Sequence, residues 1–166
     1  MSNKQEITRE EAVSQVRQMG RMLAAIYYHF SREIIAELGE EKGEQLIRRA
    51  VWNYGSERGL EQKERVIAAG HKHEPWNYIK ASDMPALGWD LEKVKEGENP
   101  THIVIHYCPF AEYWKEKDFA RIGRIYCSVD QAKYQAFHPD SDYIHLHNTL
   151  DQGDSYCEML CRLKSR

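Results

Sequence analysis

Apolar residues recur every three or four positions through the first 38 residues, and this spacing is the strongest constraint on the fold. Thr8 and Glu11 match a capping box that would begin a helix, and Gly39 would end it. The helical face between them carries Val13, Val16, Met19, Leu23, Ile26, Tyr27, Phe30, Ile34 and Leu38. A second helix is predicted from about residue 41 to 69, with an interruption near Gly59. Two helices joined by a short turn predict an antiparallel helical hairpin over residues 1–70.

The rest of the chain alternates between strand-like and helical segments. Residues 71–87 contain Pro75 and Pro85 and predict an irregular crossing segment. A hairpin is predicted from residues 89–96 and 101–107 around a turn at 97–100, and a second from residues 143–150 and 155–163. Helices are predicted over residues 110–117 and 120–137. The predicted class is therefore α+β, with the N-terminal helical hairpin and the later helices packed on a small antiparallel sheet of two hairpins.

Length and charge narrow the range of functions. A chain of 166 residues predicts one domain over residues 1–166, with the site in its α+β portion at residues 87–166. The net charge of −3 and the interleaved basic and acidic residues argue against a nucleic-acid surface. No apolar run approaches the ~18–20 residues that a membrane span needs. The polar N-terminus lacks the apolar core of a signal peptide, so we expect a cytoplasmic location with reduced cysteines.

Four cysteines, all in the final 60 residues, are then core thiols, metal ligands or catalytic groups: Cys108, Cys127, Cys157 and Cys161. In the last predicted strand, the period of two places Cys157, Met159, Cys161 and Leu163 on one face, which we expect to be buried against helices. On a strand the two cysteines lie roughly 13 Å apart, too far to bind one metal ion.

Two histidines share a face of the preceding predicted strand. His145 and His147 are separated by about 6.6 Å of backbone, close enough to converge on a metal ion. The alternative is a pair of half-exposed histidines on a solvated sheet face.

A thiol and a carboxylate lie one helical turn apart at Cys127 and Asp130. A carboxylate raises the pKa of a neighbouring thiol, so Asp130 fits a general base or a ligand-holding group better than an activator of Cys127. Asp154 follows Gly153 and is either a turn residue or a group that projects into the space at the end of the sheet.

Three short strings appear in order along the chain: Tyr107-Cys108-Pro109-Phe110-Ala111, Tyr126-Cys127-Ser128-Val129-Asp130, and the stretch from Thr149 to Cys157 that contains Gly153-Asp154. Together they resemble the bacterial L-2-amino-thiazoline-4-carboxylic acid hydrolase family. The helical N-terminus and the Trp52…Gly55…Gly59 stretch are also similar to it. The resemblance implies hydrolytic opening of a cyclic amidine-like thiazoline ring, on a route to cysteine. It carries over to Cys108, Cys127, Asp130, Gly153, Asp154 and Cys157.

The resemblance leads to an expected mechanism. Attack falls on the ring carbon between nitrogen and sulfur, by Cys127 as thiolate or by a water that a carboxylate or histidine activates. Asp130 or Asp154 would hold the amidinium through charge-assisted hydrogen bonds. The expected catalytic residues are Cys127, Asp130, Asp154, Cys108 and Cys157, and the expected substrate-binding residues are Arg124, Arg58, His147 and Tyr126. Arg121 is a further candidate for the substrate carboxylate. No cofactor or metal is expected.

Two other functions are consistent with the same residues. A small-molecule binding or sensing module without turnover, holding an apolar ligand or a haem, would use the abundant aromatic residues. A metal site would combine Cys127 and Cys157 with His145 or His147. The expected partner is a small molecule, and the long first helix, with aromatic area at Tyr27 and Tyr28, offers a homodimer interface; a monomer is the alternative.

Overall fold

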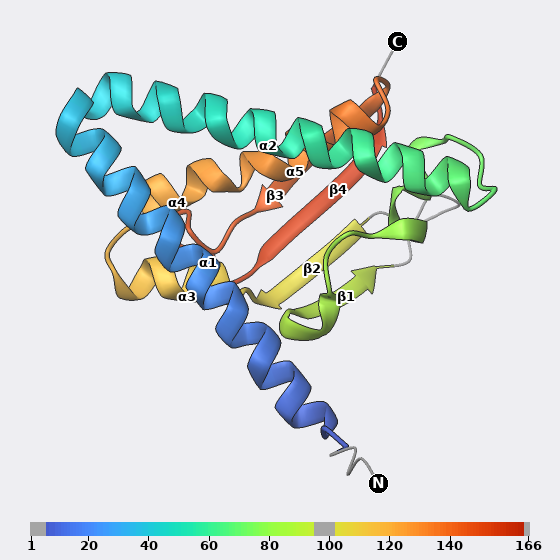
Figure 1. Ribbon diagram of the computed structural model, residues 1–166, viewed down its shortest axis with the longest axis horizontal. Helices are drawn as coiled ribbons and strands as arrows, with labels where there is room; N and C mark the ends of the chain where they lie inside the picture. Colours follow the sequence, from blue (N-terminus) through green and yellow to red (C-terminus); the bar gives the residue numbers. More distant parts are fainter. Residues whose placement is uncertain (1–5, 95–101, 165–166) are drawn as a thin grey trace, which may run out of the picture.

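The structure, a computed structural model, describes residues 6–94 and 102–164. Two long helices, α1 (Arg9–Leu38) and α2 (Glu40–Ala68), form the predicted N-terminal hairpin (Figure 1). The capping box is present: the Glu11 amide donates to the Thr8 hydroxyl, and the Glu11 carboxylate accepts from the Thr8 amide. Gly39 links the helices with a φ of 79°, a left-handed conformation that favours glycine. α2 runs without a break through Gly59, where the sequence predicts an interruption.

The segment between the hairpin and the sheet contains two 3₁₀ helices, η1 (Pro75–Ala81) and η2 (Ala86–Gly88). The strands are β1 (Asp90–Val94), β2 (His102–Tyr107), β3 (Ser141–His147) and β4 (Cys157–Leu163). They form one antiparallel sheet in the order β1-β2-β4-β3, so both predicted hairpins are present and β2 joins β4. The turn predicted at residues 97–100 lies outside the described residues. The α+β class is confirmed.

The prediction of one continuous helix over residues 120–137 is wrong, because the structure has two helices in this range. α4 (Ala120–Tyr126) ends at Cys127, and α5 (Ser128–Phe137) begins immediately after it. The Ser128 hydroxyl donates to the carbonyl oxygen of Ile125 at 2.7 Å and so competes with the regular helical pattern. Cys127 lies at this junction and packs against the apolar cluster that contains Ile122 and Val129.

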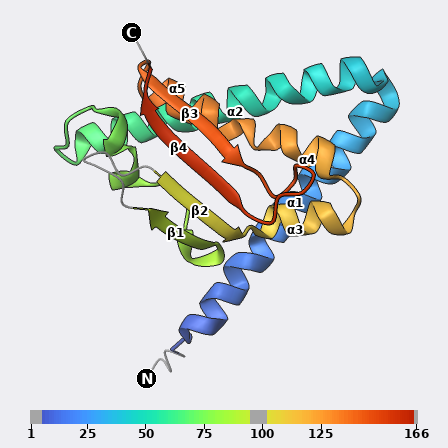
Figure 2. The ribbon, with the colours of Figure 1, turned by 180° about the vertical axis from the view of Figure 1, so that it is seen from behind.

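The helices cover one face of the sheet. α5 packs against both α2 and β3, and α3 (Pro109–Glu116) packs against α1. Figure 2 shows the opposite face of the sheet with no described helix across it. Two apolar clusters fill the space between the helices and the sheet. One centres on Trp114, Ile122 and Val129, and the other on Phe137, Tyr143 and Met159.

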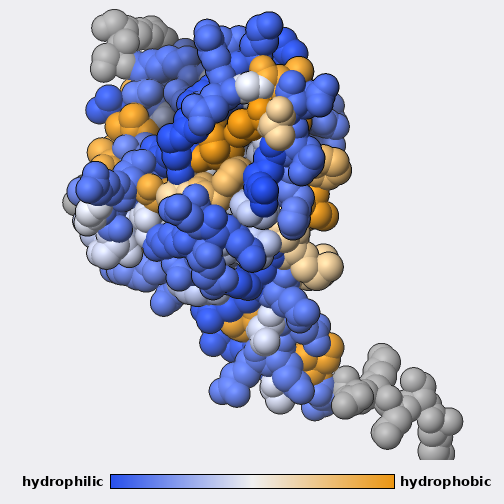
Figure 3. Space-filling model, turned by 90° about the vertical axis from the view of Figure 1, so that its left-hand side faces the viewer, coloured by the Kyte–Doolittle hydropathy of each residue, from blue (hydrophilic) through white to orange (hydrophobic). Residues whose placement is uncertain are grey.

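Alternation along β4 agrees with the expected burial. Cys157, Met159 and Cys161 are buried on the helix side, while Leu163 at the strand end is exposed. Apolar residues also reach the otherwise hydrophilic surface, some of them along the part of α1 that projects toward the N-terminus (Figure 3). No described helix is both long enough and apolar enough to cross a membrane.

Candidate active site

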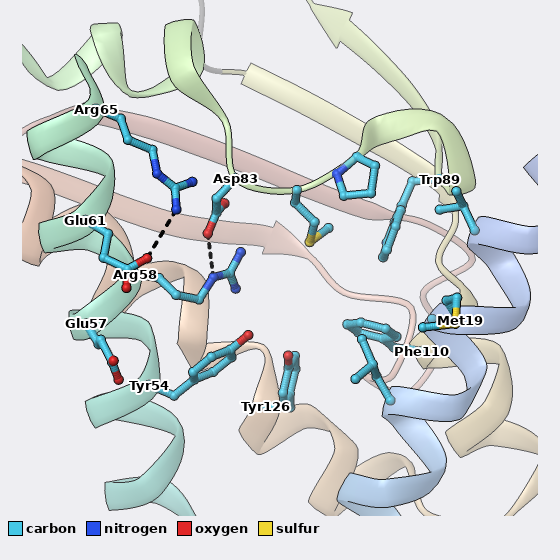
Figure 4. A pocket seen from close by; sticks show the side chains of 15 residues that line it. Met19, Tyr54, Glu57, Arg58, Glu61, Arg65, Asp83, Trp89, Phe110 and Tyr126 are labelled. Atoms are coloured by element: carbon cyan, nitrogen blue, oxygen red, sulfur yellow. Dashed lines mark hydrogen bonds and ion pairs between the residues drawn. The ribbon is translucent and has the colours of Figure 1, made fainter. Parts of the chain in front are cut away.

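An open cleft of about 450 Å³ lies between the two long helices and the loop that leads into β1. α1 contributes Met19 and Leu23 to its wall, and α2 contributes Tyr54 and Arg58. The remaining wall includes Asp83, Met84, Trp89, Phe110 and Tyr126. Figure 4 shows Arg58 pointing toward Asp83 across the cleft, with the rings of Tyr126 and Phe110 on its other side. The cleft therefore combines aromatic walls with a charged pair.

A smaller cavity of about 90 Å³ lies beneath this cleft and is more enclosed. The two share five residues: Arg58, Met84, Trp89, Phe110 and Tyr126. Beyond these shared residues, the inner cavity is lined by polar or sulfur-bearing side chains that include Cys108, Cys127, Asp130, His145, Asn148 and Cys157. The inner cavity is thus a pocket with thiols and a carboxylate, approached from the cleft between α1 and α2.

Four different element ends bring these side chains together. Cys108 follows the last residue of β2 and is the N-cap of α3. Cys127 lies at the junction of α4 and α5, and Asp130 lies in the first turn of α5. Cys157 is the first residue of β4. The structure therefore gathers four of the five expected catalytic residues, together with Arg58 and Tyr126, around one cavity.

The other expected site residues lie elsewhere. Asp154 does not line the cavity; its Oδ2 accepts from the backbone N–H of Asn148 at 2.8 Å. The Arg124 guanidinium pairs with Asp151 at 3.1 Å near the surface. Gly153 lies in the same turn with a φ of +92°, which a residue with a side chain adopts only under strain. These residues form the turn beside the cavity rather than its lining.

The prediction that His145 and His147 share a face is wrong. His145 pairs with Met159 and His147 with Glu158, so two steps on β3 correspond to one step on β4. A bulge of one residue reverses which face the later side chains take. His145 therefore lines the inner cavity, while His147 lies 3.2 Å from Asp154 and 3.9 Å from Glu158. The two histidines cannot bind one metal ion, and no group of three or more candidate ligands forms a metal site in the described parts of the chain.

Asp130 is the acidic group of the inner cavity. Lys133 Nζ lies 2.7 Å from its Oδ1, at the i, i+3 spacing of a helix. Burial alone would raise the pKa of Asp130, but Lys133, followed by His145 and Arg58, brings that pKa below its ordinary value. Asp130 is therefore a carboxylate at neutral pH, and its negative charge interacts with His145 and Arg58 as well as with Lys133.

Arg58 and Asp83 form a second charged pair at the boundary between cleft and cavity. Arg58 Nε lies 2.6 Å from Asp83 Oδ2, and both side chains are less than 15 % exposed. Burial opposes the charge on Arg58, yet the Asp83 carboxylate raises the pKa of the guanidinium overall. Because only Nε is used in this pair, the terminal nitrogens of Arg58 remain directed at the cleft (Figure 4).

The thiols are protonated at neutral pH. Burial raises the pKa of Cys127 to about 12, and the neighbouring Asn148 amide opposes that shift only in part. Burial likewise raises the pKa of Cys108 and of Cys157. His145 is also uncharged, because burial lowers its pKa below 6.5 despite the opposing effect of Asp130. The inner cavity thus offers a carboxylate, a neutral imidazole and unionised thiols.

Several lining residues have no signal in the sequence that marks them as functional. Asp83 lies in an irregular segment, and its pairing with Arg58 spans 25 positions. Asn148 follows β3 and is 1 % exposed, and its contacts with Asp154 and Leu150 arise in the turn after the strand. A side chamber of about 220 Å³ adds Tyr78, Lys133, Tyr134 and Tyr143, and shares Asp130 with the inner cavity.

Comparison with known proteins adds one finding. A family model described as L-2-amino-thiazoline-4-carboxylic acid hydrolase matches residues 15–160. No curated protein and no solved structure matches the chain. The matched span contains every residue that lines the inner cavity.

Proposed function

The chain belongs to the L-2-amino-thiazoline-4-carboxylic acid hydrolase family, and from that premise we propose that it hydrolyses a small cyclic substrate of this kind at the inner cavity. Such a substrate carries an amidine that becomes cationic on protonation and a carboxylate that is anionic. The observation that carries the proposal is the pairing of opposite charges around one pocket, with Asp130 inside it and Arg58 at its mouth. Asp130 would bind the amidinium, and Arg58 would bind the carboxylate.

Water is the better-supported nucleophile. Cys127, with a pKa of about 12, is almost entirely a thiol at neutral pH, and a thiol is a weak nucleophile. His145 is neutral and lines the same cavity as Asp130, so it can accept the proton of an attacking water. The cysteine side chains would then form a sulfur-lined wall around the ring rather than supply the attacking atom.

The reaction balances without a further reactant. Water adds to the carbon between nitrogen and sulfur, and His145 takes one of its protons. The ring bond from that carbon to nitrogen or to sulfur then breaks while the new hydroxyl group loses its remaining proton, which the released atom accepts. His145 returns the first proton to solvent. The water oxygen remains on the carbon as the carbonyl of a carbamoyl group. Asp130 stabilises the positive charge on the amidine nitrogens while the carbon is attacked.

The test follows L-2-amino-thiazoline-4-carboxylate by mass spectrometry for a product heavier by one water. We expect turnover by the wild type and a loss of about 10²–10⁴-fold in kcat/KM for Asp130→Asn and for His145→Gln. Cys127→Ser should retain activity within about tenfold. Asp142→Asn is the matched control, because Asp142 pairs with the exposed Arg162 away from the cavity. An intact-mass adduct on Cys127 during turnover, or full activity in Asp130→Asn, would contradict this mechanism.

A binding module without turnover is the second candidate. The apolar surface supplied by Trp89, Phe110 and Met84 favours it, because an apolar pocket with few polar groups suits ligand binding as well as catalysis. A ligand that raises the melting temperature and is recovered unchanged would support this candidate, provided that no thiazoline is hydrolysed.

A further inference from the structure

We propose that Asn148 is the hydrogen-bond donor that binds the oxygen atom added to the ring carbon, and that Asp154 positions it. The inference rests on the proposed hydrolysis, because the oxygen in question is the one that water supplies. It assigns a catalytic role to Asn148, whose side chain touches the reacting atoms. It assigns a positioning role to Asp154, which acts through the backbone.

The first observation is a buried side-chain donor that faces only a weak acceptor. Asn148 is 1 % exposed and lines the inner cavity, and its Nδ2 meets no oxygen or nitrogen acceptor among the described residues. Its neighbour there is the Cys127 sulfur, a weak acceptor. The Asn148 Oδ1 accepts from the Leu150 backbone amide at 3.0 Å, which fixes which end of the side-chain amide carries the N–H groups. Buried polar groups are nearly always well paired, so an oxygen acceptor from a ligand would complete this site.

The second observation is that the turn holds Asn148 from several sides. Asp154 Oδ2 accepts from the backbone N–H of Asn148 at 2.8 Å, and the backbone carbonyl of Asn148 accepts from the backbone N–H of Asp151 at 2.8 Å. The neighbouring Thr149 amide donates to Cys157 Sγ at 3.4 Å, which ties the turn to another wall of the cavity. These contacts leave the Asn148 side chain little freedom, as a preorganised donor requires.

The third observation concerns what else the inner cavity supplies. Asp130 is a hydrogen-bond acceptor, and the surrounding thiols are weak donors. When the adduct collapses, its hydroxyl group loses a proton and becomes the carbonyl, so this oxygen gains partial negative charge and is stabilised by a stronger donor. The side-chain amide of Asn148 supplies such a donor beside Cys127, and it does so without transferring a proton. Removal of one donor of this type from a comparable site lowers kcat by about 10²–10³-fold.

The experiment compares Asn148→Asp and Asn148→Ala with the wild type on L-2-amino-thiazoline-4-carboxylate. Asn148→Asp keeps an oxygen for the Leu150 amide while it removes the donor, so the turn should persist, as a thermal melt would verify. We expect kcat to fall at least about 100-fold with KM changed less than about threefold. A rise in KM with kcat retained would overturn the inference, because it would make Asn148 a binding group for the ground state.

A second set of variants tests the positioning role of Asp154. Asp154→Ala removes the acceptor for the backbone N–H of Asn148 and should lower kcat by about tenfold. Asp154→Asn retains an oxygen at this position and should keep most of the wild-type kcat. The double variant Asn148→Ala with Asp154→Ala should be no slower than Asn148→Ala alone, because Asp154 acts only through Asn148. Additive losses would overturn the positioning role.

A binding measurement separates this inference from the proposed function. N-carbamoyl-L-serine presents the carbamoyl oxygen without a reactive ring, and its Kd can be measured by calorimetry whether or not turnover occurs. We expect Asn148→Asp to weaken its binding at least tenfold. Equal affinity for wild type and variant would overturn the inference even if the wild type hydrolyses thiazolines. A wild type that binds the probe through Asn148 but hydrolyses no thiazoline would overturn the proposed function and with it the catalytic role, and would leave Asn148 as a ligand-binding donor.

Discussion

The thiol of Cys127 shows how the surroundings of a side chain decide its reactivity. The sequence leaves open whether Cys127 as thiolate or an activated water is the nucleophile. Cys127 lies where α4 meets α5, and burial raises its pKa to about 12. The thiolate fraction at neutral pH is then about a thousandfold smaller than for a cysteine of ordinary pKa.

This leads to a prediction for thiol reactivity. At pH 7.5 the native protein should react with a thiolate-selective reagent such as Ellman's reagent at least about 100-fold more slowly than the unfolded protein. The four cysteines are free, so the unfolded chain should release four equivalents of chromophore, which calibrates the measurement. One native cysteine that reacts within seconds would contradict the assignment and would return Cys127 to consideration as nucleophile.

His145 gives a prediction for the pH dependence of stability. Burial lowers its pKa in the folded protein below 6.5, so the unfolded state binds the proton more readily. Stability therefore falls as pH decreases from above 6.5 through the folded pKa, because the unfolded state then holds more protons. His145→Gln should flatten this loss between pH 7 and pH 5 in urea titrations. Parallel stability curves for wild type and variant would show that His145 does not contribute.

At the scale of elements, the contact between α2 and α5 depends on two glycines. A Cβ built on Gly55 would lie 2.5 Å from the carbonyl oxygen of Val129, and one built on Gly59 would collide with the carbonyl oxygen of Lys133. The absence of side chains at these positions lets the two helices approach through their backbones. This contact also brings Arg58, next to Gly59, over the cavity that contains Asp130.

We predict that Gly55→Ala and Gly59→Ala each lower the free energy of unfolding by about 1–3 kcal/mol, because overpacking exceeds the gain in helix propensity. Urea denaturation monitored by circular dichroism measures the change. Asn53→Ala is the matched control on α2, since Asn53 is exposed and alanine is the better helix former. Stabilisation by Gly59→Ala would mean that α2 can move away from α5 at little cost.

Local patterns in the sequence predict the elements well, and they fail where a single residue changes the register. Thr8 and Glu11 mark the start of α1, and alternation identifies the buried face of β4. The helix break at Cys127 coincides with one local hydrogen bond from the Ser128 hydroxyl, and the change of face at His147 follows from one bulged residue. Neither leaves a periodic signal.

The candidate site, like the fold, could be predicted from the sequence only in part. The resemblance names Cys108, Cys127, Asp130 and Cys157, which line the inner cavity, and also Asp154, which does not. Asp83 and His145 could not be identified in this way. The first acts through an ion pair across 25 positions, and the orientation of the second depends on strand register.

At the scale of the whole molecule, the homodimer expected from the first helix stays a prediction. Met19, Leu23, Ile26 and Phe30 are all more than half exposed on α1, and their 4-3-4 spacing is that of a seam between two helices. A second copy that presents the same stripe would bury it symmetrically. We expect a species of about twice the chain mass in light scattering, and a monomer for the double variant Ile26→Glu with Phe30→Glu.

Gln18→Glu, which adds charge at an exposed α1 position off the stripe, is the control and should leave the mass unchanged. A wild type that is monomeric at tens of micromolar would contradict the prediction. Intact activity in a monomeric double variant would show that each copy carries a full site, as the lining residues of a single chain imply.

Under the proposed function, the glycine contact between α2 and α5 would also set the length of ligand that the pocket accepts. The cation of the pocket, Arg58, lies on α2, and its carboxylate, Asp130, lies on α5. The distance between these two charges therefore depends on how closely the two helices approach. Replacing a glycine by a larger residue would widen that gap while every group that touches the ligand keeps its identity. Selectivity for longer zwitterions could therefore arise from changes behind the pocket wall, at positions that no ligand ever contacts.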